Sequence, residues 1–204
     1  MRVAIGIKSH SGWAAVVAVG IEGNEIHLVD RRRIELVDPS DVSWAKQPYH
    51  AAEMLDGADA EIIVTRGIQS AHRIAIRELR TEIEHLWTYG HAIVACALVT
   101  PLPMPDWSIA EILSVHIRMH KAEGVLFPEA LGSAAGECGV KLLRVAEKRI
   151  DETANEVFGG KLSTTVDKLA KLGKAAGPPW GRDQKMAALA AVIALNQLKA
   201  SPNA

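Results

Sequence analysis

The first forty residues contain apolar positions that alternate with small or polar ones. The alternation runs over residues 3–7, and a second apolar stretch at 16–19 follows a short polar turn at 8–12. A period of two is typical of β-strands that bury at least one face. A third apolar segment, at 26–37, is interrupted by three consecutive arginines. The pattern therefore predicts an antiparallel meander of three strands.

After residue 38 the apolar spacing changes to three and four residues, which predicts amphipathic helices. The clearest one, at 69–87, carries a stripe formed by Ile76, Leu79, Ile83 and Leu86. The continuous apolar run at 91–99 predicts a strand that is buried on both faces of a sheet. Further elements are predicted as a brief strand at 61–65, a last strand at 140–145, and helices at 50–55, 108–123, 127–138, 147–158, 163–172 and 182–198.

This order of elements predicts the fold class. Three antiparallel strands followed by alternating helices and strands imply an α/β protein with a mixed five-stranded sheet and helices on both faces. The 204 residues, 49% of them hydrophobic, fit a single domain over 1–204 with a helical second half.

Charge and cysteine content limit the classes of protein that fit. With a net charge of −1, the protein as a whole has no electrostatic attraction to nucleic acid or to a membrane surface. The longest apolar runs are far shorter than the roughly 20 residues of a membrane helix, so no membrane association is expected. Cys96 and Cys138 form no Cys-x-x-Cys pair, which favours free thiols and a cytoplasmic protein.

Two stretches carry a family resemblance. The segment Gly6-Ile7-Lys8-Ser9-His10-Ser11-Gly12 resembles the Gly-Ile-Asp-x-x-x-Gly opening of Holliday-junction resolvases. The segment Gly181 to Ala194 resembles their final helix, in which an aspartate near the start precedes an alanine-rich face. With the predicted element order, these stretches make the chain similar to the ribonuclease H-like superfamily, and the resemblance implies that fold.

The resemblance also implies a nuclease centre, from which this chain departs. Nucleases of the family hold two Mg²⁺ ions with carboxylates that activate water and stabilise the leaving oxygen. The first carboxylate belongs at the end of the first strand, where this chain has Lys8. A second belongs near Val99 and Thr100, where no carboxylate occurs, so only Asp183 matches. We expect a degenerate centre without two-metal nuclease activity.

The polar turn after the first strand is a candidate phosphate-binding site. Lys8, Ser9 and Ser11 offer donors, and Gly12 allows the backbone to approach a ligand. The alternative is a hydrated turn in which Lys8 pairs with Asp183.

Trp180 lies three residues before Asp183 in a Gly-Pro-Pro-Trp-Gly segment. A rigid aromatic side chain at this point can stack on a base, or it can close the end of the core. The first hypothesis is therefore a protein that binds nucleic acid or a nucleotide near Lys8, Trp180 and Asp183.

Two other hypotheses come from the helices. His116 and His120 share one helical face, and Glu123 continues it, so these residues could bind Zn²⁺ or Fe²⁺ in a metal-dependent enzyme. The alternative is a pair of surface or interface histidines.

The third hypothesis comes from the alanine-rich helices. They favour close helix packing, which predicts an interaction protein that forms a homodimer.

Overall fold

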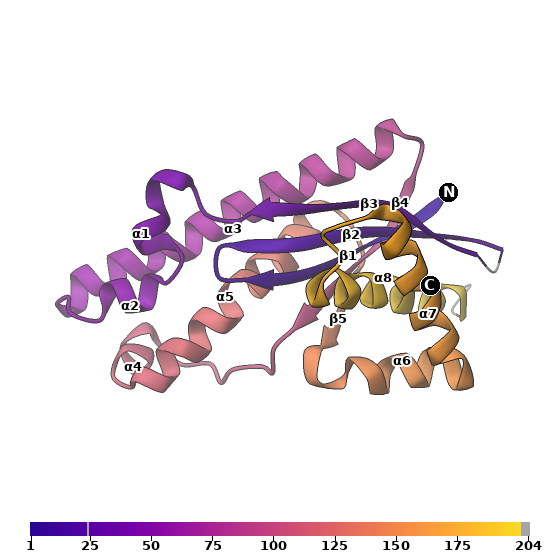
Figure 1. Cartoon of the computed structure of the whole chain (residues 1–204). Coiled ribbons are helices and arrows are strands. Elements are labelled where there is room, and N and C mark those ends of the chain that lie inside the picture. The colour runs from indigo at the N-terminus through magenta and orange to yellow at the C-terminus, as the bar shows by residue number, and fades with distance from the viewer. Residues whose placement is uncertain (24, 201–204) are drawn as a thin grey trace.

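The opening hairpin lies at the centre of one mixed sheet. The structure is a computed structural model that describes residues 1–23 and 25–200. Its strands are ordered β3-β2-β1-β4-β5 (Figure 1). The meander consists of β1 (Arg2–His10), β2 (Trp13–Glu22) and β3 (Glu25–Glu35), paired antiparallel. Next to β1 follow β4 (Ala92–Thr100) and β5 (Leu142–Ala146), both parallel. The predicted fold class is confirmed.

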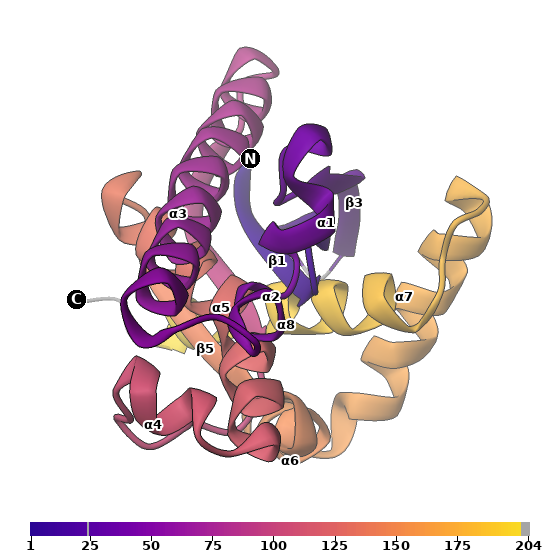
Figure 2. The same cartoon turned by 90° about the vertical axis from the view of Figure 1, so that its left-hand side faces the viewer.

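Helices cover both faces of the sheet (Figure 2). One face packs against α3 (Gly57–Thr88) and α5 (His116–Glu137). The other packs against α6 (Ile150–Phe158), α7 (Leu162–Ala176) and α8 (Arg182–Ala200). Side chains alternate along a strand, so odd-numbered residues of β1 enter the first core and even-numbered residues face α8.

A smaller helical cluster extends from the first face. It joins the beginnings of α3 and α5 to two short helices, α2 (Pro48–Ala52) and α4 (Ile109–Leu113). A third short helix, α1 (Val42–Ala45), precedes α2 and packs against the first core through Ala45. A capping box begins α4, with Ser108 and Glu111 bonded reciprocally. Single 3₁₀ turns complete the chain at Pro39–Asp41, Glu147–Arg149 and Gly159–Lys161.

Three predicted element boundaries are wrong. The helix predicted at 108–123 is divided in two, because α4 ends at Leu113 and α5 begins at His116. The brief strand at 61–65 is part of α3, in which Ala60 and Val64 pack against α2 and α5. The break expected at Gly124 does not occur, because α5 continues to Glu137 with Pro128 inside it. Residues 126–128 are buried there, so tertiary packing overrides the local helix-breaking signals.

The three arginines lie within β3 and do not interrupt it. Arg32 projects toward α3, where its Nε lies 2.7 Å from the buried carboxylate of Glu82. Arg31 projects to the opposite face and donates to four consecutive carbonyl groups of the loop between α7 and α8. Glu82 on one face of the sheet and the backbone carbonyl groups on the other therefore hold this charged segment in an extended strand.

Candidate functional site

The carboxyl ends of β1, β4 and β5 converge on a cluster of charged side chains. Lys8 lies near the end of β1 and pairs in register with Val99 of β4. Glu147 follows β5 directly, and its Oε2 lies 3.1 Å from Lys8 Nζ. The Lys8 side chain is only 12% exposed, so this ion pair is largely withdrawn from solvent.

The start of α8 supplies the second carboxylate. Asp183 Oδ1 lies 3.0 Å from His10 Nε2, and Arg182 lies 3.3 Å from Glu147. The expected pairing of Lys8 with Asp183 is therefore replaced by Lys8–Glu147 and His10–Asp183. Glu147 was missed by sequence reasoning, and the one signal for it was its position directly after the last predicted strand.

A planar stack extends from this cluster across the sheet. The rings of His10 and Trp13 are 4.5 Å apart and 15° from parallel. The guanidinium of Arg33 lies 4.1 Å from the centre of the same Trp13 ring. Trp13 and Arg33 were not among the predicted site residues, because their proximity depends on the pairing of β2 with β3.

The other residues of the predicted phosphate turn do not join Lys8. Ser9 projects to the opposite face of the sheet, where its buried hydroxyl has no partner among the described residues. Ser11 is exposed in the turn. Gly12 has φ +86°, and Lys46 and Val37 cover the position where a side chain would project. The three residues therefore do not form one donor set with Lys8.

Trp180 packs against α7. Its indole lies so close to Gly173 that no side chain would fit at that position. With Lys174 and Lys185 it also lines a hollow of about 400 Å³. This placement corresponds to the alternative in which Trp180 closes the end of the core, and a stacking role stays a prediction.

The charged residues at the carboxyl ends of β1 and β5 and at the start of α8 do not fit two Mg²⁺ ions. Such a pair needs several carboxylate oxygens that face the ions. Here the ammonium of Lys8 and the guanidinium of Arg182 both contact Glu147, and His10 contacts Asp183. Lys8, at the end of β1, is itself a cation, so it would repel a divalent ion at this point.

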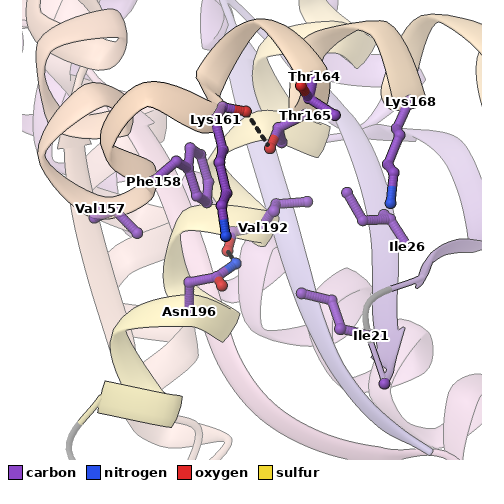
Figure 3. Close-up of a pocket in the computed structure, with 11 residues that line it drawn as sticks. Ile21, Ile26, Val157, Phe158, Lys161, Thr164, Thr165, Lys168, Val192 and Asn196 are labelled. Atoms are coloured by element: carbon purple, nitrogen blue, oxygen red, sulfur yellow. Dashed lines mark hydrogen bonds between the residues drawn. The ribbon is translucent and has the colours of Figure 1, made fainter.

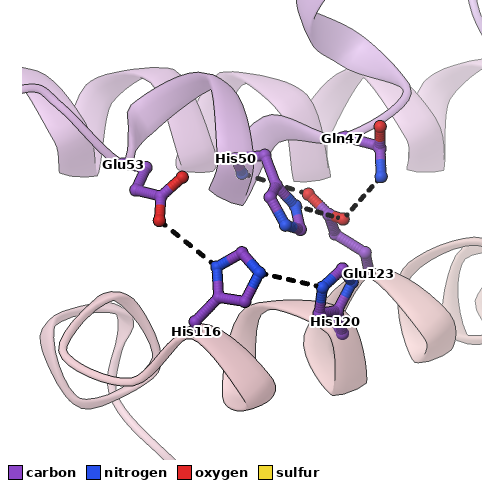
Figure 4. A network of polar contacts seen from close by, with 6 residues as sticks. All are labelled: Gln47, His50, Glu53, His116, His120 and Glu123. Carbon is purple, nitrogen blue, oxygen red and sulfur yellow. Dashed lines mark hydrogen bonds and ion pairs between the residues drawn. The ribbon is translucent and has the colours of Figure 1, made fainter.

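The two predicted histidines lie together, with a third that was not predicted (Figure 4). His116 and His120 face each other with 3.1 Å between their Nε2 atoms, and His50 of α2 completes the group. Glu123 is buried and bonded to His50 Nδ1, and it is not one of the three residues whose ligand atoms come together. His50 was missed because it lies 66 residues before His116.

A separate hollow of about 400 Å³ lies at the other end of the sheet (Figure 3). It is bordered by the turn between β2 and β3 and by α7, with Lys161, Thr164 and Thr165 at its rim. The register places this turn beside the beginning of β1, away from Lys8.

Together, the strand order and the helices on both faces of the sheet define a ribonuclease H-like α/β fold. No protein-family model matches the chain, and no curated protein matches its sequence. Two solved structures of Thermus thermophilus RuvC share its fold. One, in complex with Holliday junction substrate, is 14% identical with a TM-score of 0.53, over 98% of this chain and 97% of that one. The other is 13% identical with a TM-score of 0.51, over 98% and 96%.

The likeness to RuvC is one of fold. At 13–14% identity it shows nothing about the reaction or the site residues of this chain. Within the described residues, no helix is both long and apolar enough to cross a membrane.

Proposed function

We propose that this chain binds nucleic acid at the carboxyl end of β1 and does not hydrolyse it by the two-metal route. The observation that carries the proposal is the ion pair of 3.1 Å between Lys8 and Glu147. The pair neutralises a carboxylate that would otherwise repel phosphate, and it puts an ammonium where a metal-binding carboxylate would be needed.

The surroundings of the ion pair suit a phosphate backbone with exposed bases. The Arg182 side chain is 80% exposed at the beginning of α8, so it is available to a phosphate. The Arg33–Trp13–His10 stack provides flat surfaces of the kind on which bases stack. Glu147 and Arg182 also line a hollow of about 360 Å³ between α6, α7 and α8.

The fold supports the same class of partner. The RuvC structure that shares this fold contains a Holliday junction substrate, which makes branched DNA the first ligand to test. The net charge of −1 means that binding depends on local cations, so few phosphates are neutralised and affinity at physiological salt is modest.

Binding is tested by fluorescence anisotropy with a four-way DNA junction, a duplex and a single strand. We expect binding that weakens as salt rises from about 50 to about 200 mM. Replacing Arg182 by Ala should weaken binding and lower the salt slope by about one. Replacing Trp13 by Ala should weaken binding about tenfold. Arg77→Ala, which removes an exposed arginine from α3, is the matched control.

The proposal fails if the protein binds none of the three DNAs at low salt. It also fails if Arg77→Ala weakens binding as much as Arg182→Ala does. Cleavage of the junction in Mg²⁺ that is lost in Glu147→Gln would contradict the non-hydrolytic part alone.

We further propose that residues 1–204 form one domain of a cytoplasmic protein that pairs as a homodimer. The last helix packs on the first strand, which supports a single unit over the described residues. Cys96 and Cys138 are free thiols, as expected in a reducing compartment.

A further inference from the structure

Three histidines from two helices meet at the junction of α2 and α5, and none of them belongs to the proposed nucleic-acid surface. The candidate ligand atoms of His50, His116 and His120 all lie within 4.8 Å of one another. The rings of His50 and His120 are 4.6 Å apart, and those of His116 and His120 are 4.7 Å apart (Figure 4). The group therefore brings three imidazoles to one point.

A buried carboxylate orients His50. Glu123 is 4% exposed, and its Oε2 lies 2.7 Å from His50 Nδ1. The two oxygens of Glu123 also accept hydrogen bonds from the His50 backbone N–H at 3.1 Å and from Gln47 Nε2 at 3.2 Å. With Nδ1 donating to Glu123, the lone pair of neutral His50 belongs to Nε2.

A second carboxylate has the same relation to His116. Glu53 Oε1 lies 3.3 Å from His116 Nδ1, which favours the tautomer with its lone pair on Nε2. Metal-binding histidines almost always donate their other ring N–H to a carboxylate, carbonyl or water. Two of the three imidazoles thus have the carboxylate partner that a metal site requires.

We propose that His50, His116 and His120 bind one divalent transition-metal ion of the Zn²⁺ type, with Glu53 and Glu123 as orienting residues and not as ligands. Two tetrahedral Zn–N bonds of about 2.05 Å separate their nitrogens by about 3.3 Å. The 3.1 Å between the Nε2 atoms of His116 and His120 is close to that separation. The His50 ligand atom lies within 4.8 Å of the other two, and its movement toward them on metal binding completes a three-nitrogen site.

The ligand set and its exposure define the chemistry of the site. Neutral imidazoles favour Zn²⁺, Co²⁺, Ni²⁺ or Cu²⁺ over Mg²⁺, which prefers oxygen ligands. His116 and His120 are both exposed, so a fourth position is open to water or another ligand. The ion would link α2 to α5 and so stabilise the small helical cluster around Tyr49, Val64 and Met119. This inference does not depend on nucleic-acid binding.

The test uses the full chain, freed of metal by a chelator and titrated with Zn²⁺ or Co²⁺ alone. We expect one ion per chain by calorimetry, a Co²⁺ absorption spectrum typical of tetrahedral coordination, and a Zn²⁺-dependent rise in Tm that Mg²⁺ does not produce. His116→Ala and His120→Ala should each abolish the Co²⁺ spectrum. His85→Ala, at the far end of α3, is the matched histidine control.

Glu123→Gln tests the orienting role separately from ligation. It keeps the shape of the side chain and all three histidines, and we expect affinity to fall about 10- to 100-fold. Circular dichroism of the metal-free variant establishes that it is folded. The proposal is overturned if the unsubstituted chain binds neither ion, or if His116→Ala binds as tightly as the unsubstituted chain. Unchanged affinity in folded Glu123→Gln overturns the orienting role.

Discussion

Lys8 occupies the end of β1, where its ammonium lies 3.1 Å from Glu147 Oε2. Replacing Lys8 by Asp would put three carboxylates together, with Glu147 and Asp183 as the other two. Like-charge repulsion should lower the Tm without metal, and Mg²⁺ should restore it by neutralising the cluster.

Thermal unfolding with and without Mg²⁺ measures this effect, with Lys8→Gln as the control that removes the cation without adding a carboxylate. Mg²⁺ is the informative ion because the histidine cluster disfavours it. If Lys8→Asp shows no larger response to Mg²⁺ than Lys8→Gln, the two carboxylates do not converge as described.

Glu82 gives a second prediction at the residue scale. Burial raises its pKa from the usual 4.5 to about 7, although Arg32 opposes this shift and Asp30 adds to it. Between these two values the native state holds a proton that the unfolded chain has released. The free energy of unfolding should therefore fall as pH rises from about 4.5 to about 7, by at most about 1.4 kcal/mol per pH unit from this group.

Urea unfolding across this pH range measures the slope. Glu82→Gln should flatten it because glutamine does not titrate, whereas Glu84→Gln, which changes an exposed neighbour, should leave it unchanged. An undiminished slope in Glu82→Gln would assign the dependence to other groups.

At the scale of elements, the contact between β1 and α8 depends on Gly6. A Cβ atom at this position would overlap the carbonyl oxygen of Ala187, so the strand and helix could not keep their separation. We expect Gly6→Ala to lower the Tm strongly, with a loss of about 3 kcal/mol or more. Gly124→Ala is the matched control, because it adds the same methyl group to open space within α5 and should stabilise by about 0.5–1 kcal/mol.

The loop between α7 and α8 is held by one side chain of β3. Arg31 donates to the carbonyl oxygens of Gly177 and Pro179 at 2.6 and 2.7 Å, and to those of Ala176 and Pro178 at 2.9 and 3.0 Å. Arg31→Ala should cost about 2 kcal/mol and raise hydrogen exchange in this loop more than elsewhere.

Arg149→Ala provides the comparison for Arg31→Ala. It removes only an exposed ion pair with Glu152, so the change in stability should be much smaller. Equal losses in the two variants would mean that Arg31 does not hold the loop.

At the scale of the whole molecule, the proposed homodimer can be measured directly. Among the described residues, large apolar side chains that are more than half exposed are Met54, Ile62, Trp87, Tyr89, Leu102 and Ile117. Light scattering should give twice the 22.0 kDa of one chain. A mass of one chain at high concentration would count against the dimer.

Local periodicity was sufficient to predict most of the fold. The alternation in β1 and β2, the apolar run of β4 and the capping box of α4 are short-range signals, so they do not depend on distant residues. The errors at 61–65 and Gly124 occurred where packing between helices outweighs local preference.

The sequence by itself determined the fold class, most of the order of elements along the chain, and two residues of the candidate site, Lys8 and Asp183, because these follow from position within predicted elements. Only the tertiary structure decided their partners. Glu147 reaches Lys8 because β5 is parallel to β4, and His10 reaches Asp183 because α8 packs on β1. His50 lies beside His116 because α2 packs against α5. Contacts between distant segments depend on how the elements pack, and a local sequence pattern does not contain that information.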